Sequence, residues 1–103
     1  MPKCDPQPMV GLLKTISNPI RLKILCLLLD GEKSVSQIHD HFHSSYANIS
    51  QHMRSMQSQG LISAEKRANF MYNFITDQRA VQLVALLRKL YCPNEKTNQG
   101  ETP

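Results

Sequence analysis

Three cysteines are the most reactive side chains in this 103-residue sequence, and they lie far apart along it. Cys4 stands near the beginning, Cys26 lies in the apolar stretch RLKILCLLLDG, and Cys92 ends the stretch RKLYC. Thiols can be oxidised, bind soft metal ions, or fill a core as small apolar groups. An odd number of cysteines without a C-x-x-C pair is atypical of a secreted disulfide framework or a zinc knuckle. We therefore expect reduced thiols in a cytoplasmic protein.

The residues around Cys26 and Cys92 do not by themselves predict an activated thiolate. Lys23 stands one turn before Cys26, and Arg88 and Lys89 stand one turn before Cys92. Each basic neighbour contributes roughly 0.2–0.5 kcal/mol, whereas a helix C-terminus opposes an anion at Cys92 by about 0.3–1 kcal/mol. Because these effects nearly cancel, local chemistry leaves two interpretations of Cys26 open, a buried core residue and a regulatory thiol.

A second chemically distinctive feature is a window from His41 to Ala64 that contains no acidic residue. Lys66 and Arg67 follow it closely, and the formal charge of the whole chain is +4. A surface with basic groups and no carboxylates suits an anionic partner, so this window is the candidate nucleic-acid interface.

Capping residues, hydrophobic spacing and glycines predict a small, mainly helical domain around these residues. The polar, Pro-rich ends predict flexible tails at 1–8 and 93–103 and one folded domain over 9–92. We expect five helices and a small β-hairpin, in the order helix 10–16, helix 19–29, helix 34–41, helix 45–59, hairpin 61–76 and helix 77–92.

The last predicted helix is apolar over more than one narrow stripe, so we expect a second copy of the chain to cover it in a homodimer. The longest apolar run has six residues, far fewer than the roughly eighteen that a membrane span needs. We therefore expect no membrane association.

The two short helices within 34–59 predict a helix-turn-helix, and the hairpin that follows predicts a wing. Amide, guanidinium, imidazole and hydroxyl groups on the second helix suit the base edges of the major groove of double-stranded DNA, and basic groups on the wing suit phosphates. The expected DNA-binding residues are Ser44, Ser45, Tyr46, Asn48, Ser50, Gln51, His52, Arg54, Lys66 and Arg67.

The segments NPIRLKILCLLLDGEKSVSQI, NISQHM and GLISAEKRANFMYNFIT resemble the ArsR/SmtB family of small winged helix-turn-helix repressors, over most of the span from Leu12 to Cys92. The resemblance implies a homodimer joined through the first and last helices. It also implies that this dimer binds a pseudo-palindromic, inverted-repeat operator and releases it when an inducer alters the dimer.

Two metal sites that are usual in this family have no counterpart here. The segment SVSQI has serines in place of a Cys-x-Cys pair, and the last helix has Asp77 but no His or Glu. His39, His41 and His43 provide too few ligands for a tetrahedral site, and we interpret them as solvated or DNA-facing. We expect no metal and no cofactor.

The positions of Cys26 and Cys92 resemble a thiol-sensing branch of the family, the HlyU/BigR-like regulators. This resemblance implies that an oxidant or a reactive sulfur species bridges the two thiols and moves the dimer off DNA. An alternative keeps the DNA function but makes Cys4, Cys26 and Cys92 a trigonal thiolate site for arsenite or cadmium.

Two other classes of function remain as alternatives. A thiol enzyme has little support, because no catalytic Ser-His-Asp pattern or phosphate-binding glycine loop is present, and we expect no enzymatic activity. A winged helix that binds only proteins would show no salt dependence in an assay of operator binding.

Overall fold

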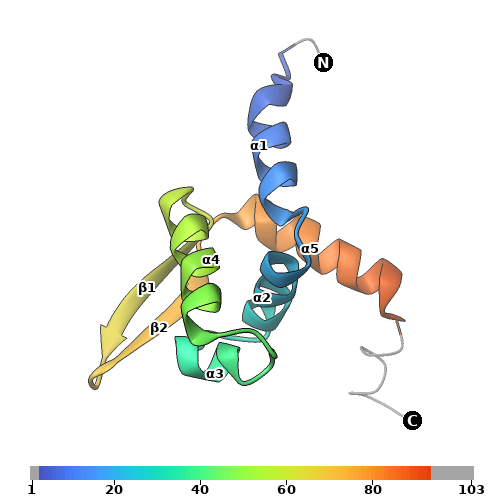
Figure 1. Cartoon of the computed structure of the whole chain (residues 1–103). Coiled ribbons are helices and arrows are strands. Elements are labelled where there is room, and N and C mark those ends of the chain that lie inside the picture. Colours follow the sequence, from blue (N-terminus) through green and yellow to red (C-terminus); the bar gives the residue numbers. More distant parts are fainter. Residues whose placement is uncertain (1–2, 94–103) are drawn as a thin grey trace.

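The computed structural model describes residues 3–93 as a winged helix, with four helices, a two-stranded antiparallel hairpin and a fifth helix. In Figure 1, α1 projects from the compact part of the molecule, and the hairpin lies on the side opposite the C-terminal end of α5. No helix within residues 3–93 is both long and apolar enough to cross a membrane. The elements are α1 (Pro6–Ile16), α2 (Pro19–Leu29), α3 (Val35–His39), α4 (Tyr46–Ser58), β1 (Ile62–Arg67), β2 (Phe70–Ile75) and α5 (Gln78–Tyr91).

Local capping explains where the helices begin. Asn18 Oδ1 accepts hydrogen bonds from the backbone N–H groups of Ile20 (2.9 Å) and Arg21 (3.0 Å), at the start of α2. Ser34 and Gln37 form a reciprocal capping box at the start of α3. Both starts agree with the prediction, because a cap depends on residues that are close together in the chain.

Two helix bounds differ from the prediction by more than one residue. Asp5 accepts a hydrogen bond from the backbone N–H of Gln7 (3.0 Å), so α1 begins at Pro6. Residues 6–8, which we expected in the N-terminal tail, are therefore helical, and prolines in a first turn cost no intrahelical hydrogen bond. The third helix ends at His39, two residues before its expected end.

The core forms around α2, which packs against α1, α4, α5 and β2. Ile24 and Leu25 of this helix are fully buried. Cys26 is half-buried beside them, so the helix that holds this thiol contacts most of the fold. The buried apolar residues are Ile16, Ile24, Leu25, Leu28, Ile38, Ile49, Met53, Met56, Leu61, Ile62, Ala80 and Val84.

The hairpin is closed by a two-residue turn at Ala68 (φ +50°) and Asn69 (φ +72°). Two successive positive φ angles are typical of the type I′ turn, whose twist matches that of the flanking strands. The strands pair from Ile62 opposite Ile75 to Arg67 opposite Phe70. This hairpin is the wing that the sequence predicts.

The α1 and α5 helices both expose large apolar side chains. The buried side of α5 includes Ala80 and Val84, and another side of the same helix is exposed. A monomer rarely exposes large contiguous apolar patches. The exposed apolar residues of the two helices are Met9, Val10, Leu13, Leu86, Leu90 and Tyr91.

Candidate nucleic-acid interface and thiol pair

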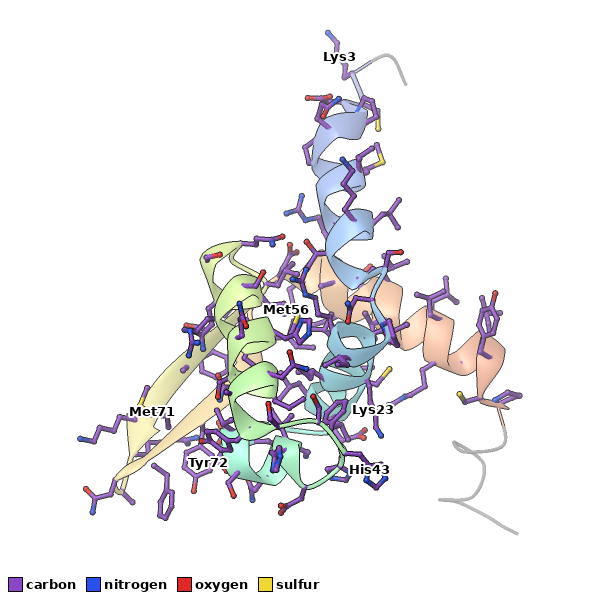
Figure 2. The ribbon with its side chains drawn as sticks, in the orientation of Figure 1. Lys3, Lys23, His43, Met56, Met71 and Tyr72 are labelled. Atoms are coloured by element: carbon purple, nitrogen blue, oxygen red, sulfur yellow. The ribbon has the colours of Figure 1, made fainter. Side chains whose placement is uncertain are left out.

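Helix α4 divides into a buried face and an exposed face. Ile49, Met53 and Met56 anchor the helix in the core, and Figure 2 shows Met56 pointing inward. The fully exposed positions on the other side recur at intervals of four, three and four residues, which places them on one stripe. This readout stripe consists of Ala47, Gln51, Arg54 and Ser58.

The readout stripe includes two of the expected DNA-binding residues, Gln51 and Arg54, and two residues that were not expected there, Ala47 and Ser58. A methyl group on such a face suits the methyl of thymine. The spacing of Ala47 and Ser58 from Gln51 and Arg54 identifies both, because positions three and four apart share one face of a helix. Ser50 is half-buried at the border of the stripe.

The residues before and within the first turn of α4 contact one another. Ser45 Oγ accepts a hydrogen bond from the Asn48 backbone (3.0 Å), and the Asn48 side-chain amide donates to Ser44 Oγ (2.6 Å). Asn48 and Ser44 are half-buried, whereas Tyr46 is exposed. Of these four expected DNA-binding residues, Ser45 and Tyr46 are therefore the exposed ones.

The histidines before α4 do not share one environment. His39 Nε2 lies 2.8 Å from the backbone oxygen of Ser44, and its ring centroid lies 5.6 Å from that of Tyr46. His39 is thus half-buried and holds the turn before α4. His43 is exposed and lies on the side of the molecule away from the hairpin (Figure 2).

His52 is half-buried in α4, where Arg21 Nε donates a hydrogen bond to His52 Nδ1 (3.1 Å). Burial, and then the charge of Arg21, lower the pKa of His52 below its ordinary value of 6.5. Because Nδ1 accepts, the neutral ring holds its proton on Nε2. His52 therefore offers a hydrogen-bond donor at Nε2, and its orientation depends on α2.

Acidification should destabilise the fold through His52. The unfolded state binds the proton at a higher pH than the folded state does, so the stabilisation is fully present above about pH 6.5 and declines as the pH falls below it. We expect the free energy of unfolding to fall more between pH 7.5 and pH 5 in the native chain than in His52→Gln. Equal losses in denaturant titrations of the two proteins would contradict this assignment, because the other three histidines are common to both.

The wing brings Lys66 and Arg67 to the end of β1, beside the turn. Both are exposed. Arg67 forms an ion pair with Glu32, and its guanidinium lies 4.9 Å from the centroid of the Tyr72 ring. Arg67 is therefore already paired with a carboxylate, whereas no carboxylate within residues 3–93 forms an ion pair with Lys66.

Asn73 connects α4 to the wing. It was not identified from the sequence as a functional or structural residue. The side chain is buried in β2, where Oδ1 accepts a hydrogen bond from Gln57 Nε2 (3.1 Å) and Nδ2 donates to Lys33 O (3.3 Å). Its backbone N–H donates to the same oxygen (2.7 Å), and its C=O accepts from the Lys33 N–H (3.1 Å). This network joins α4, β2 and the segment before α3.

Replacing Asn73 by leucine should destabilise the protein by about 1–3 kcal/mol, because the Gln57 amide and the second bond to Lys33 O lose their partner. Denaturant unfolding at fixed protein concentration measures the change. A double-mutant cycle with Gln57→Leu supplies the control. We expect the double variant to lose less than the sum of the two single losses, whereas strict additivity would show that the pair is not coupled.

Cys26 and Cys92 lie on neighbouring helices. The α2 and α5 helices pack together, and Arg88 Nη1 donates to the backbone oxygen of Cys26 (3.3 Å) and to both carboxylate oxygens of Asp30 (3.2 Å). Cys92 caps α5, and its backbone N–H donates to Arg88 O (2.8 Å). Arg88 thus links the backbone at both cysteines.

The two cysteines differ in solvent exposure. Cys26 is half-buried and Cys92 is exposed, and no disulfide joins them. Lys23, which precedes Cys26 by one turn, extends toward α3, where Nζ donates to His41 O (2.8 Å) and lies 4.8 Å from the centroid of the Phe42 ring. Its ammonium group is therefore held by partners other than the thiol.

The alternative metal site is not assembled within one chain. Cys4 is exposed immediately before α1, and Figure 1 shows that this end of α1 is remote from α2 and from the end of α5. Within residues 3–93, no group of three or more His, Cys, Asp or Glu side chains could hold a metal ion. Within a single chain, the alternative set of Cys4, Cys26 and Cys92 is therefore not brought together, because α1 separates the first thiol from the other two.

Comparison of the sequence with known proteins agrees with the winged-helix fold. Residues 18–64 match the family model described as bacterial regulatory protein, arsR family. The Vibrio cholerae protein named transcriptional activator HlyU is 35% identical over 81% of this chain and 77% of its own length. A Xylella fastidiosa protein named biofilm growth-associated repressor is 30% identical over 84% of this chain and 75% of its own length.

The same similarity is present in three dimensions. The structure of reduced HlyU from Vibrio cholerae superposes with a TM-score of 0.77 at 34% identity, and the match covers 82% of this chain and 88% of that one. The family match includes α2, α3, α4 and the start of β1. It therefore includes the helix that carries the readout stripe, α4.

Proposed function

The chain belongs to the ArsR family of bacterial regulatory proteins, and we propose that it is a repressor whose homodimer leaves its operator when Cys26 and Cys92 are bridged. Membership of this winged-helix family makes the protein a DNA-binding transcriptional regulator. Direct repression, the form of the dimer, the residues that bind DNA and the thiol switch are the parts that we propose.

The observation that supports DNA binding most strongly is the readout stripe. Gln51 and Arg54 project from a helix whose other face is fixed in the core, and no acidic side chain occurs on α4. Lys66 adds an exposed basic group on the wing. An amide and a guanidinium suit adenine and guanine edges in the major groove, and Lys66 suits a phosphate.

The exposed apolar residues of α1 and α5 support a homodimer. These two helices project beyond the compact part (Figure 1) and together expose six large apolar side chains. Burial of such surface is the main driving force for association. A twofold dimer would present two α4 helices, which requires an operator with two inverted half-sites about one helical turn (roughly 34–36 Å) or a multiple of it apart.

The position of Cys92 next to the proposed dimer surface supports a thiol switch. Leu90 and Tyr91 directly precede Cys92 and are exposed. A covalent bond from Cys92 to Cys26 would tie the last turn of α5 to α2 and displace these apolar side chains. A twofold dimer whose contacts shift in this way would change the spacing of its two α4 helices.

Two balanced routes lead to a bridge. Hydrogen peroxide oxidises the two thiols to a disulfide and is reduced to two water molecules. Alternatively, a persulfide donor transfers one sulfur to each cysteine and leaves as a thiol, after which the two cysteine persulfides join as a trisulfide and release hydrogen sulfide. A disulfide requires Cα atoms within about 7 Å, whereas a trisulfide spans a longer gap.

Selection of duplexes from a random pool by the reduced protein tests the DNA-binding part. We expect enriched sequences with two inverted half-sites, a protein mass in solution of two chains, and affinity that falls linearly with salt on logarithmic axes. Enrichment of no sequence, together with binding that is insensitive to salt, would contradict the proposed function.

A further inference from the structure

The tip of the wing exposes large apolar side chains. Phe70 is 59% exposed and Met71 is 48% exposed, directly after the turn at Ala68 and Asn69. Figure 2 shows Met71 and Tyr72 on opposite sides of the hairpin. The tip is therefore apolar on both faces.

Each of these apolar residues has a basic neighbour across the hairpin. The strand register places Lys66 opposite Met71 and Arg67 opposite Phe70. An interface with another protein chain would favour apolar neighbours at these positions, whereas DNA offers phosphates for the basic groups and stacked bases for the apolar ones. The α1 and α5 surfaces proposed for the dimer lie on other parts of the molecule (Figure 1).

We propose that Phe70, with Met71 beside it, is an apolar wedge that enters the minor groove next to each half-site, unstacks one base step and bends the DNA. This inference rests on the proposed DNA-binding function and extends it. Apolar side chains that enter the minor groove in this way kink the duplex toward the major groove. The protein thereby selects deformable steps such as TA or CA, without reading a base edge.

A series of contacts holds the proposed wedge in place in the protein without DNA. The Phe70 ring centroid lies 6.4 Å from that of Tyr72, and Arg67 lies over the other ring while paired with Glu32. Glu32 belongs to the segment between α2 and α3, so these side chains are linked to the body of the domain through Arg67. Anchoring limits the conformational entropy that Phe70 loses on insertion.

Fluorescence of 2-aminopurine measures unstacking directly. A duplex selected by the native protein would have this base in place of each adenine in turn, across both flanks of the half-sites. We expect one step in each flank to brighten on binding of the native protein, and Phe70→Ser to abolish the increase and weaken binding by about tenfold. Phe70→Leu, which keeps an apolar side chain, should restore most of both effects.

Lys66→Ala provides a contrasting variant. It should weaken binding through a lost phosphate contact and leave the fluorescence increase in place. The slope of log affinity against log salt concentration should decrease in magnitude by about one. Phe70→Ser should leave the salt dependence unchanged. These two patterns separate the apolar wedge from a basic wing.

Three results would overturn the inference while leaving the proposed function intact: no brightened step with the native protein, equal brightening with Phe70→Ser, or an altered number of chains per particle in that variant. The last result would show that the tip covers another chain. If the native protein selects no duplex at all, the proposed function fails, and the wedge fails with it.

Discussion

Cys92→Ser is expected to bind DNA as tightly as the native protein when reduced, and to stay bound when a persulfide donor releases the native protein. Cys92 caps α5 through its backbone and is exposed, so serine preserves the cap and removes only the thiol. A switch of practical value changes affinity at least tenfold, or about 1.4 kcal/mol. Fluorescence anisotropy of a labelled duplex, titrated with the donor, measures both properties.

Cys4→Ser is the matched control for this experiment, because it removes an exposed thiol far from α2. It should respond as the native protein does. Cys26→Ala should abolish the response as Cys92→Ser does, and alanine is preferable to serine at this half-buried site because it introduces no polar group. A full response in Cys92→Ser, or a lost response in Cys4→Ser, would contradict the assignment of the switch.

Arg54→Ala is expected to weaken binding to a selected duplex by roughly 1–3 kcal/mol, the cost of losing a bidentate contact to guanine. Arg54 is exposed on the readout stripe, one turn beyond Gln51 and away from the core. The loss should be confined to duplexes with the selected half-sites, and the salt dependence should change little. Anisotropy titrations at several salt concentrations, with selected and scrambled duplexes, measure these quantities.

Arg79→Ala is the matched control for Arg54→Ala. Arg79 is also an exposed arginine, but it lies at the start of α5 and pairs with Asp77. Its removal lowers the net charge by the same amount and should change affinity by only a small, sequence-independent factor. If the two variants weaken binding equally on scrambled and selected duplexes, Arg54 contributes charge rather than base recognition.

Elements that depend on short-range rules were predictable from the sequence. Asn18 caps α2, the Ser34 box caps α3, and the turn at the wing tip falls inside the predicted hairpin 61–76. In each case the determining residues lie within a few positions of one another. The start of α1 was missed because a Pro-rich segment suggests a tail, whereas Asp5 makes it a first helical turn.

Features that depend on long-range packing were not predictable. Asn73 bonds Gln57 and Lys33, which are 16 and 40 residues away. The pairing of Arg21 with His52 spans 31 residues, and burial followed by the charge of Arg21 lowers the pKa of this proposed base-reading group. Periodicity identifies the face on which a residue lies, but it does not identify the partner from another element.

The proximity of α2 and α5 is the structural fact that supports the thiol hypothesis. In the sequence, the helix-turn-helix and the hairpin lie between Cys26 and Cys92. In the fold, the guanidinium of Arg88 contacts the backbone of Cys26, and the backbone of Arg88 contacts that of Cys92. A bridge between these cysteines would therefore act on an existing contact between two helices.

A titration with glutathione persulfide tests whether a bridge between Cys26 and Cys92 releases the DNA. DNA binding and intact protein mass are recorded on the same samples. We expect release to proceed in step with a species in which one chain has gained one sulfur and lost two hydrogens, with the peptides that contain Cys26 and Cys92 joined after digestion. Complete release while both thiols remain unmodified, or complete bridging while the duplex stays bound, would contradict it.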